Sequence, residues 1–440
     1  MKKYLFIDNY RGFSKTTIPL VDVNFMVGEN STGKTSVLSL LRILSTSSLF
    51  MGPNFGGGEE VQFGHFNEVV SAHATDRSYF RIGFVEQRSH PNKKGEQLIS
   101  AMLLTYKDAS GIPKLSRMTS SSGGHEISLR IVGDKVWYHT KSPTKKSLPT
   151  AEDMKLSLQQ WGEDHAGEGS EWNDLETPKG AGAGEVPLYI LLHFAMEKSK
   201  SQAAFPLIFG GFNEPLIWIA PIRTKPRRTY DEPNTSFSSE GSHTPYVIRR
   251  MLNGPEASKF KKFMDQVGKA SGLFQSIEIK KFGKSDDAPF EVDAVLDNKA
   301  LNLSWLGYGV SQSLPIFVEL LDRPKGSSFA IQQPEVHLHP RAQASLGDVF
   351  YEMALLDRKR FVIETHSDFT IDRFRMNYRR KKSKRNKDNG PRSQILFFER
   401  RDSLNTVTAL PIGTRGELPA DQPQSYREFF VNEEIELLDV

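Results

Sequence analysis

Residues 28–35 read "GENSTGKT" and match the pattern G-x-x-x-x-G-K-[ST] at every defined position. An apolar run, residues 23–27, precedes them, and a helical pattern of apolar residues follows from Lys34. Between a strand and a helix, this pattern wraps backbone N–H groups around phosphate oxygens. A chance glycine turn before a helix is the competing interpretation, but it does not account for the strand, the Lys-Thr pair and the helix together. The stretch therefore predicts a binding site for a nucleoside triphosphate.

The residue types in this loop predict a role for each part of it. The glycines permit a tight turn, and the amino end of the following helix adds partial positive charge. Lys34 is expected to neutralise the β- and γ-phosphates, and the Thr35 hydroxyl is expected to coordinate Mg²⁺. The predicted nucleotide-binding residues of the loop are Gly28, Glu29, Asn30, Ser31, Thr32, Gly33, Lys34, Thr35 and Ser36.

The composition of the 440 residues, with 38% hydrophobic and 25% charged, is that of a soluble globular protein. No stretch approaches the roughly 18 consecutive apolar residues of a membrane span. The N-terminal "MKKYLFIDNY" reaches Asp8 too soon for the apolar core of a signal peptide, so a strand is expected there. With 0 cysteines, disulfides and thiolate metal sites are excluded, and a cytoplasmic location is expected. The net charge of +4 is small, so any binding of a polyanion would need a local cluster.

The rest of the sequence divides into segments of different pattern. Residues 4–7 and 16–20 predict strands, and residues 79–140 predict antiparallel strands because β-branched and aromatic residues are frequent there. Residues 142–185 are polar and glycine-rich and predict a linker or surface insertion. Helices are expected at 186–198, 246–252 and 257–270, with a strand in "PLIWIAP"; after Gln275, strands and helices are expected to alternate. "FAIQQP", "RFVIETH" and "ILFFER" are short apolar runs typical of a mostly parallel sheet.

The chain resembles the ABC-type ATPases of the SMC, RecF and OLD group, and within it the short-armed ATPases of bacterial anti-phage systems, most of all the AriA ATPases of PARIS systems. The resemblance rests on "IDNYRGF", "VNFMVGENSTGKTSVL", "FGHFNEVV", "WIAPIR", "LGYGVSQSLPI", "QQPEVHLHPRAQ" and "IETHSD", in that order. It implies an α/β fold: a P-loop ATPase head with a mostly parallel core sheet, an antiparallel β subdomain and a helical insertion or lid. It also implies three parts: an N-terminal ATPase lobe (1–141), a helical lid region (142–272) and a C-terminal ATPase lobe (273–440).

Two of these motifs imply contacts with the γ-phosphate of ATP. "GYGVSQ" precedes an apolar helical run, which puts Gly309, Ser311 and Gln312 at the amino end of a helix. In the family this turn contacts the γ-phosphate held by the phosphate loop of another subunit; a simple capping turn is the plainer alternative. "IETHSD" ends a strand, where His366 resembles the histidine that hydrogen-bonds the γ-phosphate or the attacking water.

The strand "FAIQQPE" departs from the family pattern. In the ABC-type ATPases that this chain resembles, two acidic residues end the corresponding strand. The first supports Mg²⁺ through water, and the second activates the attacking water. Here Gln332 and Gln333 occupy these places, with Glu335 two positions beyond. An amide keeps the volume of a carboxylate but lacks its charge, so we expect ATP and Mg²⁺ to bind (metal-side residues Thr35 and Gln332) and hydrolysis to be slow. Gln332 belongs either to a naturally slow switch or to an engineered ATP trap, and the second explanation is favoured.

Other residues carry weaker expectations. His337 and His339 have the spacing of a metal pair, but no third ligand is evident, and they resemble a loop that packs across the family's dimer. Arg11 matches a basic residue that lies near the phosphates in relatives, although an exposed arginine at a strand end explains it equally well. Arg223 is expected to be either a lid or partner contact or a solvated charge.

Residues 375–387 carry eight Lys or Arg and no acid. Contact with nucleic acid, docking of an acidic partner or phage-encoded trigger protein, and an ordinary solvated loop all stay open for this basic stretch.

Two functions are weighed for the whole chain. The first is a sensor or scaffold ATPase of an anti-phage complex, at least a homodimer, that holds and releases a separate toxic effector such as a nuclease. The second is a RecF-like repair ATPase that clamps DNA in an ATP-closed dimer. A metabolic kinase would leave "GYGVSQ" and "IETHSD" unexplained.

Overall fold

The computed structural model describes residues 2–46, 55, 64–89, 96–142, 150–163, 172–176, 186–199, 215–231, 234–285, 288–380 and 390–429. The chain forms two compact units, each assembled from separate stretches of sequence. The first unit comprises Met1–Val21, Glu29–Pro215 and Phe398–Ala409, and the second comprises Asp22–Gly28, Leu216–Phe397 and Leu410–Val440. Since the chain passes from the second unit to the first directly after Gly28, the loop that follows Gly28 belongs to the first unit.

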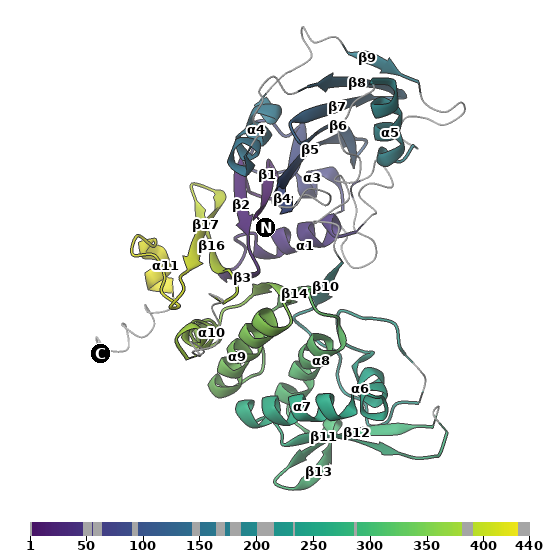
Figure 1. Cartoon of the computed structure of the whole chain (residues 1–440), viewed down its shortest axis with the longest axis vertical. Helices are drawn as coiled ribbons and strands as arrows, with labels where there is room; N and C mark the ends of the chain where they lie inside the picture. Colours follow the sequence, from purple (N-terminus) through teal and green to yellow (C-terminus); the bar gives the residue numbers. More distant parts are fainter. Residues whose placement is uncertain are drawn as a thin grey trace. The chain divides into compact units, whose positions relative to one another are not determined.

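The first unit is built on an eight-stranded antiparallel sheet in the order β2-β1-β4-β5-β6-β7-β8-β9 (Figure 1). The strands predicted at 4–7, 16–20 and within 79–140 are confirmed, as are the helices expected from Lys34 and at 186–198. The elements of this unit are β1 (Lys2–Asp8), β2 (Thr16–Leu20), α1 (Lys34–Leu44), α3 (Phe66–Val69), β4 (Tyr79–Ser89), β5 (Gln97–Ala109), β6 (Ile112–Ser122), β7 (His125–Val132), β8 (Lys135–Lys141), α4 (Ala151–Glu163), β9 (Asn173–Leu175) and α5 (Leu188–Ser199).

The expectation of a linker over residues 142–185 was wrong where the structure describes helix α4. Met154, Leu158 and Trp161 recur at helical spacing along α4, and all three are buried with Phe6 of β1 and Leu103 of β5 in one apolar cluster. Figure 1 shows α4 beside β1 and β4, and contacts with β1, β4 and β5 place it on one face of the sheet. The helix was not predicted because polar residues on both sides of it dominate the composition of the segment, and its apolar stripe is narrow. The glycine-rich end of the segment, "KGAGAGE", lies outside the described residues.

The second unit contains a six-stranded sheet in the order β10-β14-β15-β3-β16-β17. Its strands β10, β14, β15 and β3 run parallel, which confirms the predicted α/β class with a mostly parallel core sheet. Strands β16 and β17 continue into the first unit. The strands of this sheet are β3 (Val23–Gly28), β10 (Leu216–Ile219), β14 (Ser328–Gln332), β15 (Arg360–Glu364), β16 (Ser393–Arg401) and β17 (Leu404–Ile412).

Helices between the strands bury the parallel sheet. The predicted helices at 246–252 and 257–270 are confirmed as α6 and α7. The helices of the unit are α6 (Thr244–Asn253), α7 (Ala257–Ser271), the 3₁₀ turn η2 (Leu303–Trp305), α8 (Tyr308–Asp322), α9 (Pro340–Leu356), α10 (Asp368–Arg380) and α11 (Gln424–Phe429). Phe329 of β14 stacks on Phe361 of β15 at 5.6 Å between ring centroids, and both belong to the main apolar core of the unit. The continuous apolar runs of these strands are therefore explained by burial.

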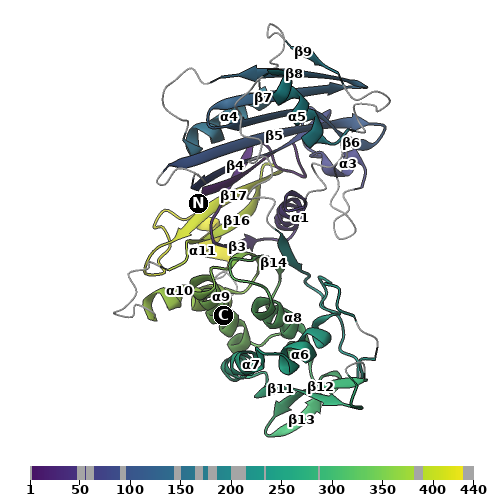
Figure 2. The ribbon, with the colours of Figure 1, turned by 45° about the vertical axis from the view of Figure 1, so that its right-hand side comes forward.

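The expected alternation of strands and helices after Gln275 was wrong at its start. Strands β11 (Ser276–Lys281), β12 (Phe290–Leu296) and β13 (Lys299–Asn302) form a separate antiparallel sheet, shown in Figure 2 near α6 and α7. Asp297 and Asn298 connect β12 to β13 with φ angles of 47° and 62°. These are the positive φ angles of a two-residue hairpin turn, which Asp and Asn tolerate better than other side chains do.

None of the helices in the described parts of the chain is both long enough and apolar enough to cross a lipid bilayer.

Helix α4 offers a direct test of its packing, because Leu158 is fully buried whereas Leu156, two residues earlier, is 57% exposed. Leu158→Ala removes buried apolar volume and is expected to lower the free energy of unfolding by about 2–5 kcal/mol. Leu156→Ala is the matched control and should change it by less than about 0.5 kcal/mol. Urea unfolding followed by tryptophan fluorescence measures both. Equal, small effects of the two substitutions would mean that α4 does not cover the sheet.

Candidate phosphate loop and sheet edge

The phosphate loop runs from the end of β3 to the start of α1. Gly28 closes β3 with φ 143°, Ser31 has φ 63° and Gly33 has φ 92°, so the backbone turns sharply before the helix begins at Lys34. The Nζ of Lys34 donates to the carbonyl oxygen of Glu29 at 2.6 Å, and the Thr32 hydroxyl donates to the same oxygen at 2.8 Å. Lys34 is buried within the loop. The cation predicted from the sequence is therefore held at the centre of the turn.

The close approach of Phe13 makes glycine necessary at position 33. A Cβ on Gly33 would lie 2.5 Å from two ring carbons of Phe13, a distance at which something must move. Phe13 is itself fully buried and packs edge-on against Phe398, with ring centroids 6.4 Å apart. The loop therefore packs closely against the buried Phe13 ring.

Three residues that sequence reasoning missed brace the loop. Arg400 Nη2 donates to the Ser31 carbonyl oxygen at 2.9 Å, and its Nε donates to Asn405 Oδ1 at 3.4 Å. Tyr10 donates its hydroxyl to the Ser36 carbonyl oxygen at 3.1 Å. Arg400 and Asn405 are separated from the loop by about 370 residues of sequence, so no local pattern indicates them.

Arg11 lies in the turn after β1, near α3. Its Nε donates to the Glu68 carbonyl oxygen at 3.3 Å, and its carbonyl oxygen accepts from Asn405 Nδ2 at 3.0 Å. Arg11 has φ 41°, a conformation that is uncommon for a side-chain-bearing residue. A role of Arg11 in phosphate binding stays a prediction.

In the second unit, the register of the parallel strands aligns the residues at the carboxyl edge of the sheet. Gln332 of β14 pairs with Glu364 of β15, and Glu364 pairs with Met26 of β3, two residues before Gly28. The N–H of Thr365 donates to the Met26 carbonyl oxygen at 3.1 Å, which extends the pairing past the strand end. Ligands of open α/β sheets bind beyond this edge, so these residues form a candidate catalytic edge.

Glu364 is the acid at this edge that the sequence analysis did not assign. Gln332 donates from its amide Nε2 to Glu364 Oε2 at 2.9 Å, and both side chains are buried. The missing signal was the register between the two strands, which cannot be read from either strand alone. Thus a carboxylate lies directly beside Gln332, although it comes from the neighbouring strand.

The turn after β14 brings Gln333, Glu335 and His366 together. The N–H of Gln333 donates to the Glu364 carbonyl oxygen at 2.8 Å, and the N–H of His366 donates to Glu335 Oε1 at 2.7 Å. Glu335 Oε2 is enclosed and has no hydrogen-bond partner in the structure. Burial raises the pKa of the Glu335 carboxyl, although hydrogen bonds from backbone N–H groups and the Thr365 hydroxyl and the charge of Arg223 oppose this. The His366 side chain is exposed beside it.

Arg223 is not a solvated charge, one of the alternatives that the sequence left open; a lid or partner contact stays a prediction. Its side chain is 3% exposed, and its Nη2 donates to the Gln332 carbonyl oxygen at 2.9 Å. Burial lowers the pKa of Arg223 to about 10, against the opposing effect of the Glu335 charge, so the guanidinium stays protonated at neutral pH. Its Nε and Nη1 are enclosed without a hydrogen-bond partner in the structure. The solvated-charge alternative was wrong because basic residues follow Arg223 in sequence while the fold turns this one inward.

The residues of "GYGVSQ" occupy the first turn of α8, as predicted. Gln312 is buried, and its amide binds both backbone groups of Arg223: Oε1 accepts from the N–H and Nε2 donates to the carbonyl oxygen, each at 3.0 Å. Ser311 donates its hydroxyl to the Tyr308 carbonyl oxygen at 3.1 Å. A Cβ on Gly309 would lie 3.1 Å from the His337 carbonyl oxygen. The turn therefore connects the Arg223 backbone to the segment after β14.

His337 and His339 have separate structural surroundings. The His337 ring lies 5.2 Å from the Tyr308 ring, and His339 is the N-cap of α9, where its Nδ1 accepts from the Ala342 N–H at 3.4 Å. An N-cap side chain satisfies one of the unpaired N–H groups of a helix start.

Only residues 375–380 of the basic stretch are described, and they complete α10; residues 381–387 lie outside the described residues. Arg375 Nε donates to the Gly416 carbonyl oxygen at 2.9 Å, and Arg379 Nε donates to the Arg415 carbonyl oxygen at 3.0 Å. These two arginines thus also have a structural role in holding the turn after β17.

The loop, in the first unit, is chemically suited to the phosphates of ATP, and the sheet edge, in the second unit, separately offers a carboxylate of the kind that Mg²⁺ prefers. Positive φ angles, the start of α1 and the absence of acidic residues from its first turn favour a bound polyphosphate. The hydroxyl of the exposed Thr35 and the carboxylate of Glu364 are oxygen donors, which Mg²⁺ prefers.

Two protein-family models match parts of the chain. Residues 1–91 match the model described as "AAA ATPase domain". Residues 221–372 match the model described as "AAA domain, putative AbiEii toxin, Type IV TA system". The first match includes the phosphate loop, and the second includes Arg223, Gln312, Gln332, Glu364 and His366. The chain therefore carries ATPase sequences of the AAA type. No curated protein matches it.

Among the solved structures that are similar to this chain over most of its length are SMC head domains. An SmcHead bound to the C-winged helix domain of ScpA is 10% identical, with 93% of this chain and 97% of that chain covered and a TM-score of 0.43. The Pyrococcus furiosus Smc head with an extended coiled coil is 11% identical, with coverage of 99% and 100% and a TM-score of 0.42. The Thermotoga maritima SMC head is 10% identical, with coverage of 93% and 97% and a TM-score of 0.39. At these identities and TM-scores, the likenesses are too weak to assign a partner or a substrate.

The buried guanidinium of Arg223 can be tested against the enclosed carboxylate of Glu335. Arg223→Met is expected to lower the free energy of unfolding by about 3–5 kcal/mol, because it removes the hydrogen bond to the Gln332 carbonyl oxygen and a buried charge that interacts with the Glu335 carboxylate. The effects of Arg223→Met and Glu335→Gln should not add: the double variant should differ from their sum by about 0.5–3 kcal/mol. Urea unfolding of the four proteins measures this coupling.

Arg228→Met is the control for Arg223→Met, because the Arg228 side chain is 73% exposed; its effect should stay within about 0.5 kcal/mol. Strict additivity of Arg223→Met and Glu335→Gln would show that the two side chains do not interact.

Proposed function

We propose that this chain is an ATP-binding subunit of a bacterial anti-phage complex, that it forms at least a homodimer, and that it controls a separate toxic effector such as a nuclease. The observation that carries ATP binding is the phosphate loop, with Lys34 at its centre and Gly33 fitted against Phe13. ATP with Mg²⁺ would be held by the loop N–H groups, Lys34 and the Thr35 hydroxyl. A relationship to the AriA ATPases of PARIS systems is part of this proposal.

The defence context is supported by the family model over residues 221–372, whose description names an AbiEii toxin and a type IV TA system. In our proposal the toxic activity belongs to a separate effector, because the sequence offers an ATPase but no recognisable nuclease motif. The basic stretch at 375–387 is the proposed contact for an acidic partner, a phage-encoded trigger protein or nucleic acid.

Hydrolysis is proposed to be slow because of the residues at the sheet edge. Glu335 and His366 would position the attacking water, and Gln333 lies between them and the strand end. Gln332 offers an amide where the family pattern has an acid, so Glu364 is the carboxylate left to steady the water shell of Mg²⁺. The amide of Gln332 already donates to this carboxylate at 2.9 Å.

Assembly follows from the proposed role of the first turn of α8. Gly309 and Ser311 would contact the γ-phosphate held by a second copy of the chain, and Gln312 would hold this turn to the Arg223 backbone, as its two hydrogen bonds indicate. ATP would then join two copies.

Gly33→Ala tests ATP binding and assembly together. The added Cβ meets the Phe13 ring at 2.5 Å, so the loop should lose its shape. We expect binding of a fluorescent ATP analogue to weaken at least about 100-fold. Light scattering in Mg-ATP should show a dimer or larger assembly for the unaltered chain and a monomer for the variant. Phage plating in cells that carry the chain with its neighbouring genes should lose protection in parallel.

Gly123→Ala is the matched control, because Gly123 has φ 57° and would place a Cβ in open space. It introduces similar backbone strain in a hairpin turn and should leave ATP binding, mass and protection unchanged. A nucleotide-bound chain that stays a strict monomer would remove the proposed assembly. Loss of ATP binding without any loss of protection would show that the protection does not depend on ATP binding by this chain.

Gln332→Glu tests the account of slow hydrolysis. A second carboxylate at this edge should raise phosphate release at saturating Mg-ATP by roughly 10²- to 10³-fold, since one well-placed electrostatic group is typically worth that factor. It should also lower the unfolding temperature in EDTA, because two carboxylates replace the amide–carboxylate hydrogen bond.

Glu364→Gln is the complementary change: it keeps a hydrogen-bonding side chain beside Gln332 but removes the charge, and it should abolish the remaining turnover while ATP still binds. Equal turnover in all three proteins would show that neither position serves the metal.

A further inference from the structure

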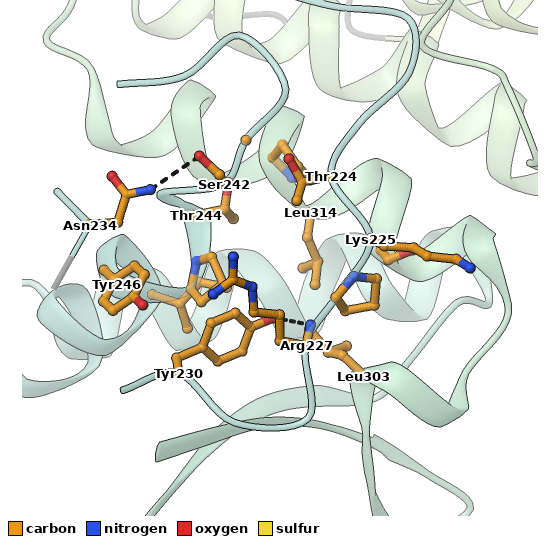
Figure 3. Close-up of a pocket in the computed structure, with 16 residues that line it drawn as sticks. Thr224, Lys225, Arg227, Tyr230, Asn234, Ser242, Thr244, Tyr246, Leu303 and Leu314 are labelled. Carbon is orange, nitrogen blue, oxygen red and sulfur yellow. Dashed lines mark hydrogen bonds between the residues drawn. The ribbon is translucent and has the colours of Figure 1, made fainter. Parts of the chain in front are cut away.

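A cavity of about 350 Å³ lies within the second unit, apart from the residues of the phosphate loop (Figure 3). Three stretches of chain form most of its wall: the segment after β10, the start of α6 and one face of α8. Its lining residues are Thr224, Lys225, Pro226, Arg227, Tyr230, Asn234, Gly241, Ser242, Thr244, Pro245, Tyr246, Ile248, Leu303, Ser311, Leu314 and Pro315. Except for Ser311, none of them belongs to the proposed ATPase machinery.

Two threonine hydroxyls in this cavity have no hydrogen-bond partner in the structure. The Oγ1 atoms of Thr224 and Thr244 are both enclosed and unpaired, and Thr244 is 4% exposed. An enclosed hydroxyl without a partner is costly, and native proteins satisfy most such groups. Both residues line the cavity, and because each Oγ1 atom has almost no accessible surface, a rotation of the side chain is needed before an acceptor oxygen of a ligand can pair with it.

The charge of the lining favours an anion. Lys225 and Arg227 are basic, and none of the described lining residues is acidic. In Figure 3 Arg227 crosses the middle of the cavity above the Tyr230 ring, whereas Lys225 points away from it. Lys225 Nζ lies 5.9 Å from the centre of the Tyr308 ring. Arg227 is therefore the cation directed at a ligand.

The start of α6 adds to this preference. Gly241, Ser242 and Thr244 line the cavity where this ten-residue helix begins, and its first turn contains no acidic residue. The amino end of a helix carries partial positive charge and favours anions. Ser242 also accepts from Asn234 Nδ2 at 3.2 Å, which holds the rim of the cavity together.

The size and the apolar part of the lining limit the kind of anion. A volume of about 350 Å³ is at the lower end of the range for small-molecule sites. Leu303, Leu314 and Pro315 supply an apolar surface, and the rings of Tyr230 and Tyr246 border the same space. We propose that this cavity binds an organic phosphate of mononucleotide size, with the phosphate near Arg227 and Thr244 and the apolar body against α8.

A ligand bound in the cavity would affect the catalytic edge through the backbone of the segment that follows Arg223. Thr224 follows Arg223 directly, and Arg223 holds both Gln312 and the Gln332 carbonyl oxygen. A ligand that fixes residues 224–227 would thus also fix the segment on which the edge depends.

The test uses adenosine 5′-monophosphate as the probe and the full chain with Lys34→Ala, which disables the phosphate loop. Isothermal titration should show that AMP binds this variant and that adenosine, which lacks the phosphate, binds at least about tenfold more weakly. Arg227→Gln, added to Lys34→Ala, should weaken AMP about tenfold or more, since a charge-assisted hydrogen bond is lost. Thr244→Val, which keeps the shape but removes the hydroxyl, should weaken it severalfold.

Arg228→Gln is the matched control: it removes the same charge from the next residue, whose side chain is 73% exposed and does not line the cavity. It should leave the AMP affinity unchanged. The proposal is overturned if neither AMP nor ribose 5-phosphate binds the Lys34→Ala chain at millimolar concentration. Equal binding of adenosine and AMP, equal losses for Arg227→Gln and Arg228→Gln, or an unchanged affinity in Arg227→Gln would overturn it as well.

Discussion

The second unit depends on one buried cation, the guanidinium of Arg223. The Arg223 side chain is 3% exposed, and it donates a hydrogen bond to the main-chain carbonyl oxygen of Gln332 at the end of β14. Its own main chain is held on both sides by the amide of Gln312. A desolvated charge tolerates few arrangements, because every displacement leaves it with fewer compensating dipoles. The strand end and the first turn of α8 are thus fixed through the same residue.

The register of the parallel strands is the second constraint on the sheet edge. Since Gln332, Glu364 and Met26 are aligned across β14, β15 and β3, the carboxyl edge presents an amide and a carboxylate in adjacent positions beside β3. A glutamine and a glutamate that face each other can share a hydrogen bond, whereas two glutamates would repel unless a proton or a metal lay between them. The amide at position 332 therefore lets the Gln332 and Glu364 side chains lie side by side without a cation between them. In the ATPase we propose, this is also a reason for the edge to be slow.

Local patterns predicted most of the framework and part of the candidate site. The residues around Gly33 and the apolar runs of β14 and β15 have sequence signatures, because strand burial and a phosphate loop each impose residue types at fixed spacing. The position of Glu364 beside Gln332 was not predicted, since it depends on the pairing between two strands. The contact of Arg400 with the phosphate loop was not predicted because its partner is about 370 residues away in sequence. Arg223 was misjudged for another reason: a run of basic residues usually lies in water, and nothing local distinguishes the one that the fold buries.

The same basic segment shows how one short loop can serve two places. Arg223 lies inside the core of the unit, while Arg227, four residues later, is exposed and reaches across the cavity beside α6 and α8. The residues between them have little freedom: the N–H of Thr224 donates to the Glu240 carbonyl oxygen at 2.8 Å, and that of Arg227 donates to the Tyr230 hydroxyl at 3.0 Å. A loop pinned at both ends cannot move Arg227 by much without disturbing Arg223. Residues 224–227 therefore connect the cavity to the catalytic edge. In our proposal, a compound that binds in the cavity affects the catalytic edge through the position of the buried Arg223 guanidinium.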